Sequence, residues 1–285
     1  MPPMKQLLLL LSILLSASAH AQESAVSADP AAASEAVLLR PDWKPLFAAC
    51  GATGSVVLFD AARNSWIASD TADWRTETLP ASTFKIVNLL IALETGVISS
   101  EQDTVRWPGS TDTALYGYRP EIYHDMTVQE AFTESAGWAF IELAKKVGRD
   151  QYKALLARAG YGNGKLSERG TDFWNFGAFG ISPYDQVRFL RALYNRSLPF
   201  SAAHLDVVRR VLVSERTAHY SISAKTGWTR HGGVNTGWWV GWVESKRGTV
   251  FFATRLLQDR KKARADFGSC RKEITRTVLR SLGAL

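Results

Sequence analysis

The sequence contains few of the residues that build metal clusters or disulfide frameworks. Two cysteines and five histidines occur in 285 residues, too few thiols for a zinc site held by cysteines. No apolar stretch approaches the roughly 20 residues that span a bilayer. With 46% hydrophobic and 21% charged residues, the chain has material for one large or two small globular domains.

The first 21 residues differ from the rest in composition. Lys5 precedes the apolar run Leu7–Leu15, and small residues follow up to Ala21. A charged start, a short apolar run and an Ala-x-Ala exit are typical of a secretory signal peptide rather than of a membrane anchor. We expect residues 1–21 to be removed and residues 22–285 to reach the periplasm with no integral membrane segment.

The net charge is +7, and the one dense basic run is Arg260–Arg264. This run has no interleaved aromatic residues, so we interpret it as a solvated turn and expect no nucleic-acid partner. The positive field favours anionic small substrates. Cys50 and Cys270 form either one disulfide, permitted in an exported protein, or two buried thiols.

Strand patterns at both ends of the chain surround a helical middle. We predict an α+β fold in which about five antiparallel strands form a sheet flanked by N- and C-terminal helices. Residues 22–285 form a single domain, with a sheet lobe at about 36–79 and 211–285 and an all-helical lobe at about 80–210. The predicted strands are Gly54–Asp60, Trp66–Ser69, Ser221–Trp228, Gly237–Glu244 and Thr249–Leu257, and the predicted helices include Pro41–Ala49, Thr127–Val147, Asp150–Ala159, Ser182–Asn195 and Arg271–Leu282. A site is expected in the cleft between the lobes.

A further helix is predicted from Pro80 to a stop at Gly96, with apolar residues on every face. Ser82 and Lys85 are three residues apart at its start, so they share one face. A serine hydroxyl needs a neighbouring base to act as a nucleophile. Burial favours a neutral Lys85 that can serve as that base. The alternative is a surface lysine beside a helix-capping serine.

Lys225, Thr226 and Gly227 follow one another on a predicted strand. A cation and a hydroxyl can bind a carboxylate there, and Gly227 leaves room for a substrate at the strand edge. A single such tripeptide is a weak signal, but its combination with the Ser/Lys helix in an exported chain is much stronger.

Together these motifs resemble those of penicillin-recognising serine enzymes. Within that superfamily the mature chain resembles a class D, oxacillinase-type β-lactamase over nearly its whole length. The resemblance implies the β-lactamase/transpeptidase-like fold, a β-lactam as the small-molecule partner, and hydrolysis of its amide bond. It is carried by Pro80-Ala81-Ser82-Thr83-Phe84-Lys85, Arg106-Trp107-Pro108-Gly109, Tyr161-Gly162-Asn163, Phe173-Trp174, Gly180-Ile181-Ser182, Lys225-Thr226-Gly227-Trp228 and Gly237–Glu244.

The resemblance also implies the roles of the catalytic residues. Ser82 would be acylated by the β-lactam, and Lys85 would be carboxylated on its amine by CO2 to become the general base. No metal and no other cofactor is implied. Trp174 would hydrogen-bond the lysine carbamate, and the backbone N–H groups of Ser82 and Trp228 would form the oxyanion hole.

The substrate carboxylate would be bound by Lys225, Thr226 and Arg271. Arg271 matches the family only by its place at the last helix, and a solvated arginine is the alternative. The substrate range would depend on a long, Gly-rich loop at Thr229–Thr236 and on the rim residues Trp107, Tyr116 and Tyr118.

The sequence departs from the family pattern at two places. Ser135 can relay a proton, but Gly137 stands where the family has valine. This change is expected to open space beside Lys85, which admits water and exposes the carbamate. Asn175 and Phe176 stand where relatives carry an apolar residue and Glu, which changes the wall behind the carbamate.

Two other functions fit the same motifs. A D-Ala-D-Ala peptidase also acylates such a serine and would release penicillin slowly. A β-lactam sensor domain would stay acylated, but such domains are tethered to membrane helices, whereas this chain has only a cleavable signal. The oligomeric state is left open between monomer and homodimer.

Overall fold

The computed structural model describes residues 36–166 and 170–285. The predicted signal peptide, residues 1–21, lies outside the described residues. Among the residues that are described, no helix is long and apolar enough to cross a membrane.

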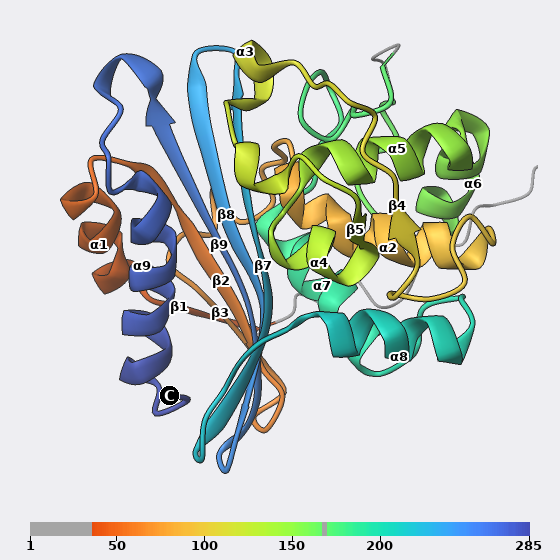
Figure 1. Ribbon diagram of the computed structural model, residues 1–285. Coiled ribbons are helices and arrows are strands. Elements are labelled where there is room, and N and C mark those ends of the chain that lie inside the picture. The colour runs from red at the N-terminus through yellow and green to blue at the C-terminus, as the bar shows by residue number, and fades with distance from the viewer. Residues whose placement is uncertain (1–35, 167–169) are drawn as a thin grey trace, which may run out of the picture. The chain divides into compact units, whose positions relative to one another are not determined.

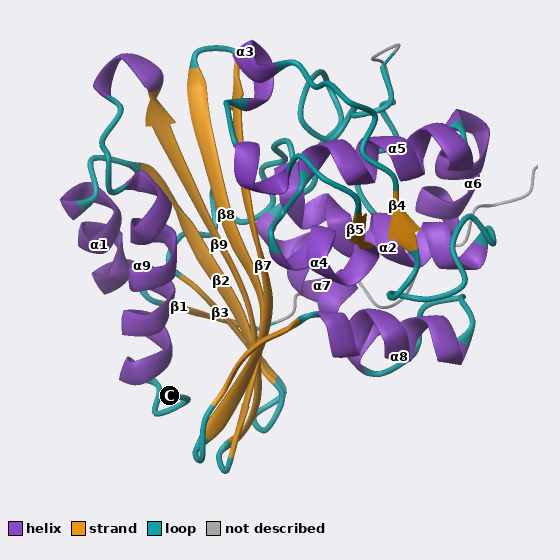
Figure 2. Cartoon of the chain, viewed as in Figure 1, coloured by secondary structure: helices purple, strands orange, loops and turns teal. Residues whose placement is uncertain are grey.

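A seven-stranded sheet, with strand order β1-β3-β2-β9-β8-β7-β6, forms the centre of the fold (Figures 1 and 2). β1 runs parallel to β3, and every other neighbouring pair is antiparallel. The predicted α+β class is confirmed, but the number of strands is larger than the predicted five. The bounds are β1 Val37–Leu39, β2 Thr53–Asp60, β3 Ser65–Ala68, β6 Val213–Arg216, β7 Tyr220–His231, β8 Val234–Ser245 and β9 Gly248–Asp259.

The two strands missed by the prediction lie at the edges of the sheet. β1 has three residues and β6 has four, too few for a recognisable alternation of apolar and polar residues. The prediction of a long loop at Thr229–Thr236 is also wrong. β7 and β8 continue through it and meet at a two-residue turn, where Gly232 and Gly233 have φ of +59° and +78°, as in the tight hairpins that favour glycine.

Helices cover both faces of the sheet. α1 and α9 lie on one face, and the helices from α2 to α8 lie on the other, where a two-stranded sheet of β4 and β5 joins them (Figure 1). The bounds are α1 Lys44–Ala49, α2 Lys85–Glu94, α3 Thr113–Tyr116, α4 Val128–Thr133, α5 Gly137–Val147, α6 Arg149–Ala159, α7 Pro183–Tyr194, α8 Ala202–Val211, α9 Phe267–Ser281, β4 Thr104–Val105 and β5 Met126–Thr127. The described residues also form the 3-10 helices η2 Pro41–Trp43, η3 Ala81–Phe84, η4 Pro120–Ile122 and η5 Arg260–Lys262.

Because both faces are covered, the protein has two apolar cores. Successive residues of β2 point to opposite faces, so Val57 and Phe59 belong to the core beneath the helical side, whereas Val56 and Leu58 belong to the core beneath α1 and α9. The sheet is therefore an apolar wall between two packed layers, and one end of that wall carries the site.

The segment around Ser82 agrees with the prediction of a buried helix. Its first turn is the 3-10 helix η3, and α2 follows directly with every residue from Lys85 to Leu93 buried. Gly96 ends it with φ of +69°, the left-handed conformation that glycine adopts at helix ends.

The predicted single helix over Thr127–Val147 is wrong. It is broken between α4 and α5, where Ser135 has φ of +57°. A non-glycine residue in this region is strained, and such strain is typical of functional sites. The break turns the Ser135 side chain out of the helical path.

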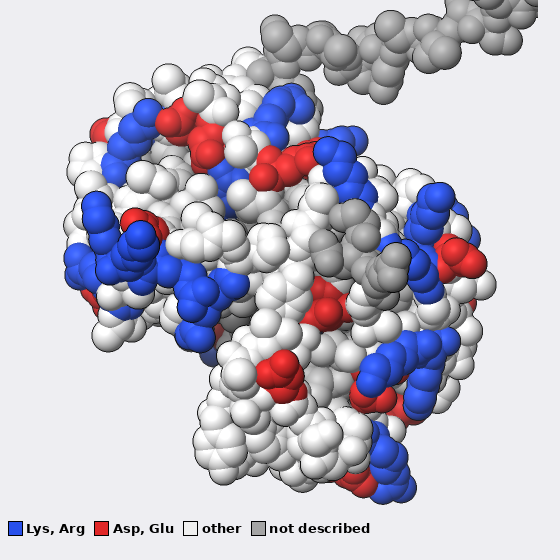
Figure 3. All heavy atoms as spheres, turned by 90° about the horizontal axis from the view of Figure 1, so that it is seen from above, with Lys and Arg blue, Asp and Glu red and all other residues white. Residues whose placement is uncertain are grey.

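The basic run Arg260–Arg264 is exposed throughout, and Arg264 forms an ion pair of 2.6 Å with Asp266. Figure 3 shows that Lys and Arg side chains gather at one edge of the face it displays, while charges of both signs alternate elsewhere. The turn carries its own counter-charge, which agrees with its interpretation as a solvated turn.

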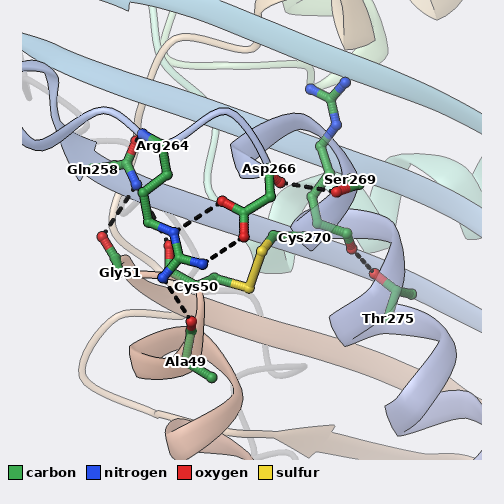
Figure 4. The surroundings of a disulfide bond; sticks show 10 residues. Ala49, Cys50, Gly51, Gln258, Arg264, Asp266, Ser269, Cys270 and Thr275 are labelled. Atoms are coloured by element: carbon green, nitrogen blue, oxygen red, sulfur yellow. Dashed lines mark hydrogen bonds and ion pairs between the residues drawn. A yellow bond between two sulfur atoms is a disulfide. The ribbon is translucent and has the colours of Figure 1, made fainter.

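A disulfide joins Cys50, at the end of α1, to Cys270 in α9 (Figure 4). The two cysteines are 220 residues apart in sequence, and their Cα atoms are 6.1 Å apart. Beside the bond, Arg264 donates a hydrogen bond of 3.0 Å to the carbonyl of Ala49 and satisfies one of the free groups at the end of α1. Of the two possibilities left open by the sequence, the structure has the disulfide.

The disulfide predicts a measurable stability difference. Replacing both Cys50 and Cys270 by alanine should lower the free energy of unfolding by about 2–4 kcal/mol, because the unfolded chain loses a long-range constraint. Urea unfolding of the double variant measures this, and reduced wild-type protein is the matched control. Two reactive thiols in unreduced, denatured wild-type protein would contradict the bond.

Candidate active site

A cavity of about 450 Å³ opens between the helical side of the fold and the free edge of β7, which is the part of this strand that extends beyond its pairing with β6. Ser82, Lys85, Ser135, Thr226, Gly227, Trp228 and Arg271 all line it, together with Thr111, Leu115, Tyr116, Gly117, Arg119, Ile122, Tyr123, Gly137, Trp138, Asn175, Phe176, Thr229 and Arg230. Segments from the start, the middle and the end of the chain thus meet at one site.

Ser82 and Lys85 form the pair that the sequence predicted. Lys85 Nζ donates a hydrogen bond of 2.8 Å to Ser82 Oγ. Lys85 is only 2% exposed, and its Nζ lies 5.3 Å from the ring centre of Phe140. Burial, aided by the positive charge of Arg119, lowers the pKa of Lys85 to about 7. A large fraction of this amine is therefore neutral at physiological pH.

The backbone before Ser82 is held in an unusual conformation. Ala81 has φ of +51°, and its N–H donates a hydrogen bond of 3.0 Å to the carbonyl of Trp174. Trp174 is buried and stacks on Phe84 with ring centres 4.8 Å apart. Trp174 therefore supports the turn that presents Ser82, while its side chain is not among the cavity-lining groups.

Lys225 and Ser135 meet beside this pair. Lys225 Nζ donates a hydrogen bond of 3.0 Å to Ser135 Oγ and one of 3.3 Å to the carbonyl of Thr226. Burial lowers the pKa of Lys225 well below its usual value, and nearby positive charges add to this effect, with Lys85 contributing most among them. Two lysine–hydroxyl pairs, Lys85 with Ser82 and Lys225 with Ser135, thus lie near each other at the site.

Gly227 lines the cavity, but another neighbour explains the glycine. A Cβ atom at this position would lie 2.8 Å from the carbonyl oxygen of Pro80 and 3.1 Å from Thr83 Cγ2. From the sequence alone, Gly227 is explained by the room that a substrate needs at the strand edge. The structure shows that β7 packs directly on the turn that carries Ser82.

The backbone of β7 presents N–H groups to the cavity. The N–H of Ala224 donates to the carbonyl of Leu212 at 2.8 Å, on the side of β7 away from β8. Peptide groups of a regular antiparallel strand alternate between its two sides, and the pairing of β7 with β8 is unbroken. The N–H groups of Thr226 and Trp228 therefore point to the same free edge. The N–H of Ser82 lies in the first turn of a helix, where such groups lack intrahelical partners.

Arg271 reaches the cavity from α9. Its Nη1 donates a hydrogen bond of 2.5 Å to the carbonyl of Gly227, and its guanidinium lies 5.9 Å from the ring centre of Trp228. Burial lowers the pKa of Arg271 to about 10, and its Nε is buried without a hydrogen-bond partner. Among the described residues no ion pair neutralises this cation, so it is suited to an anionic ligand.

The two departures from the family pattern both face the cavity. No heavy atom lies within 4 Å of a Cβ placed on Gly137, so the absence of a side chain leaves open space. Gly137 is one turn before Phe140 on α5, the ring that faces Lys85. Asn175 accepts a hydrogen bond of 2.7 Å from Thr229 through its carbonyl, and Phe176 lies edge-on to Tyr116.

Of the three rim aromatics, only Tyr116 lines the cavity, where its hydroxyl donates to the carboxylate of Asp172. Trp107 stacks on Tyr123 with ring centres 4.8 Å apart. Tyr118 is 74% exposed. The sequence also missed Arg119, because a single arginine in an irregular segment belongs to no motif.

The charge of the cavity has one sign. Three of its lining residues are arginines, Arg119, Arg230 and Arg271, a fourth, Lys85, is partly protonated, and none of the described lining residues is Asp or Glu. Within the described ranges, no cluster of His, Cys, Asp and Glu could hold a metal ion. The base for any reaction at Ser82 must therefore be sought among the lysines, and the cavity attracts anions.

Comparison with known proteins agrees with these features. The family described as the penicillin binding protein transpeptidase domain matches residues 54–280. The β-lactamase OXA-2 of Salmonella typhimurium is 34% identical over 255 residues, which cover 89% of this chain and 88% of that protein. The β-lactamase OXA-10 of Pseudomonas aeruginosa is 34% identical over 249 residues, covering 85% of this chain and 89% of its own length.

Solved structures give the same result. A class D β-lactamase from Sebaldella termitidis superposes with a TM-score of 0.82 at 33% identity, covering 88% of this chain and all (100%) of that one. A class D β-lactamase from Nostoc gives a TM-score of 0.78 at 34% identity, covering 85% of this chain and 99% of that one. The resemblance predicted from the motifs is confirmed, and the chain belongs to the class D serine β-lactamases.

Proposed function

We propose that the cavity hydrolyses the amide bond of penicillin-type β-lactams through an acyl-enzyme on Ser82, and that this activity confers resistance to these antibiotics. The observation that carries the proposal is the hydrogen bond of 2.8 Å between Lys85 Nζ and Ser82 Oγ. A partly neutral amine in contact with a serine hydroxyl is an activated nucleophile in place. The relatives named β-lactamases support the reaction.

The first step is attack of Ser82 on the β-lactam carbonyl. Its proton passes to the group on Lys85, because no carboxylate of the described residues lines the cavity. We assign the oxyanion hole to the N–H groups of Ser82 and Trp228. The free edge of β7 and the first turn of η3 support this assignment, since both present unpaired donors. Loss of one such donor typically costs about 3 kcal/mol of transition-state stabilisation.

Lys85 is suited to carry a carbamate, formed when its neutral amine adds CO2. Two features support this fit: a lowered pKa and burial against Phe140. When bound, the carbamate supplies a general base in place of the amine. Trp174 and Ser82 are the residues proposed to hold it, and the cationic side chains of the cavity favour its negative charge.

Release of the acyl group requires water at Ser82. The open space at Gly137 gives water a route to the Lys85 side of the cavity. In the earlier acylation step the lactam C–N bond breaks, and Ser135 and Lys225, which are hydrogen-bonded to each other, can relay a proton to the nitrogen that leaves. The substrate carboxylate is assigned to Lys225, Thr226 and Arg271, of which Arg271 offers a buried, unpartnered Nε.

The competing functions differ in the fate of the acyl group. A sensor domain or a D-Ala-D-Ala peptidase would keep it for long times. Access of water beside Lys85 favours the hydrolase. The proposal includes export to the periplasm directed by residues 1–21. It also includes an oligomeric state of either monomer or homodimer.

Purified mature protein should hydrolyse benzylpenicillin with many turnovers. Ser82→Ala should lower the rate by at least about a thousandfold, because the nucleophile is lost. Absorbance of the β-lactam ring measures both. A stoichiometric burst followed by a stable acyl-enzyme would exclude the hydrolase and favour the sensor or the peptidase.

Activity should depend on the protonation of Lys85. The pKa of Lys85 is lowered to about 7, so the amine is neutral above this pH and charged below it. We expect kcat/KM to fall as the pH decreases through about 7, since the ammonium neither accepts a proton nor adds CO2. A pH profile at fixed bicarbonate measures this. In protein supplied with 13C-bicarbonate, the resonance of the Lys85 carbamate carbon should disappear over the same pH range.

The control for this experiment is Lys85→Ala, which should stay inactive with or without bicarbonate. Bicarbonate-independent activity in that variant would contradict the role of Lys85. A rate that is flat from mildly alkaline to mildly acidic pH would contradict the assigned protonation.

Gly137→Val should lower, severalfold, the bicarbonate concentration that gives half-maximal activity. Its side chain fits the open space and shields the Lys85 side of the cavity from water. Titration of activity with bicarbonate measures the effect, and Gly137→Ala should give a smaller change of the same sign. An unchanged requirement in both variants would show that Gly137 does not control exposure of the carbamate.

A further inference from the structure

Arg119 is a cavity cation that the proposed mechanism does not use. It lies between α3 and η4 on the helical side and lines the cavity with Ser82 and Lys85. Its backbone is fixed, because its N–H donates a hydrogen bond of 3.0 Å to the hydroxyl of Tyr123. The side chain therefore starts from an ordered position at the wall.

The guanidinium is held beside the Ser135 turn. Its Nη1 donates a hydrogen bond of 3.1 Å to the carbonyl of Glu134, and the next residue, Ser135, accepts the hydrogen bond from Lys225. The charge of Arg119 contributes, after burial, to the lowered pKa of both Lys85 and Lys225. Arg119 thus lies near Lys225, one of the residues already assigned to the substrate carboxylate.

Much of the binding capacity of Arg119 is unused. Its Nε donates to Glu121 at 2.8 Å, but the two side chains are 40% and 58% exposed, and an ion pair of such exposure holds weakly. No hydrogen-bond partner of its Nη2 occurs among the described residues. A guanidinium with a free amino group, at a cavity where no described lining residue is Asp or Glu, can bind an anion.

We propose that Arg119 is a substrate-binding residue that binds the ring carboxylate of the β-lactam from the helical side of the cavity. This inference rests on the proposed function. Arg119 and Arg271, which are far apart in sequence, would then both bind the same carboxylate. Binding therefore requires the helical side and the sheet side together, and Arg119 selects substrates that carry this negative charge.

The test compares benzylpenicillin with its methyl ester, which differs by the loss of the negative charge. Arg119→Gln should lower kcat/KM for the acid about tenfold or more, the usual effect of losing a hydrogen bond to a charged group. The ester should be affected little, so the acid-to-ester ratio should collapse. Arg119→Lys should restore part of the ratio, because it keeps the charge.

Arg106→Gln is the matched control, since Arg106 is an 82% exposed arginine whose side chain pairs with Asp125 and does not line the cavity. It should leave the ratio unchanged. Equal losses for acid and ester in Arg119→Gln, or no loss, would overturn the proposal, and the melting temperature identifies a variant that fails to fold. If wild-type protein is acylated but does not turn over, the proposed hydrolysis fails, and the same comparison made on acylation rates still decides the role of Arg119.

Discussion

A lysine amine that has no carboxylate partner among the described residues, buried beside a serine hydroxyl, is the constraint on which the site depends. A charged ammonium in this position would be costly, so burial selects the neutral form. The 3-10 turn before α2 brings the two groups to 2.8 Å. The apolar surroundings of Lys85 resemble ordinary core packing. At this site they determine the protonation state of Lys85 and hence the reactivity of Ser82.

The elements around this pair fix the position of Ser82 and set the charge of the cavity. The left-handed Ala81 is held by Trp174, and Gly227 allows β7 to pack on the same turn. The nucleophile is therefore supported from the helical side and from the sheet. Positive charge without a lining carboxylate among the described residues makes the cavity selective for anions before any specific contact forms.

The sequence predicted the parts of this arrangement that depend on local pattern. The buried helix, the Ser82/Lys85 spacing and the long strands follow from periodicity and turn residues, whereas the short strands β1 and β6 carry too little pattern. The break at Ser135 was not foreseen, because the apolar pattern continues from α4 into α5 and tertiary contacts impose the positive φ. Arg119 was missed for a related reason, since only the fold brings it next to the Ser135 turn.

The order of the strands has a consequence for the biogenesis of the protein. β2, near the start of the described chain, pairs along its whole length with β9, near the end, and Arg271 follows later still. Such contacts close a very long loop, which slows folding relative to local structure. A chain interrupted before β9 lacks the partner of β2 as well as Arg271. Enzyme activity can therefore arise only after synthesis of the last strand, so a truncated chain is inactive rather than partly active.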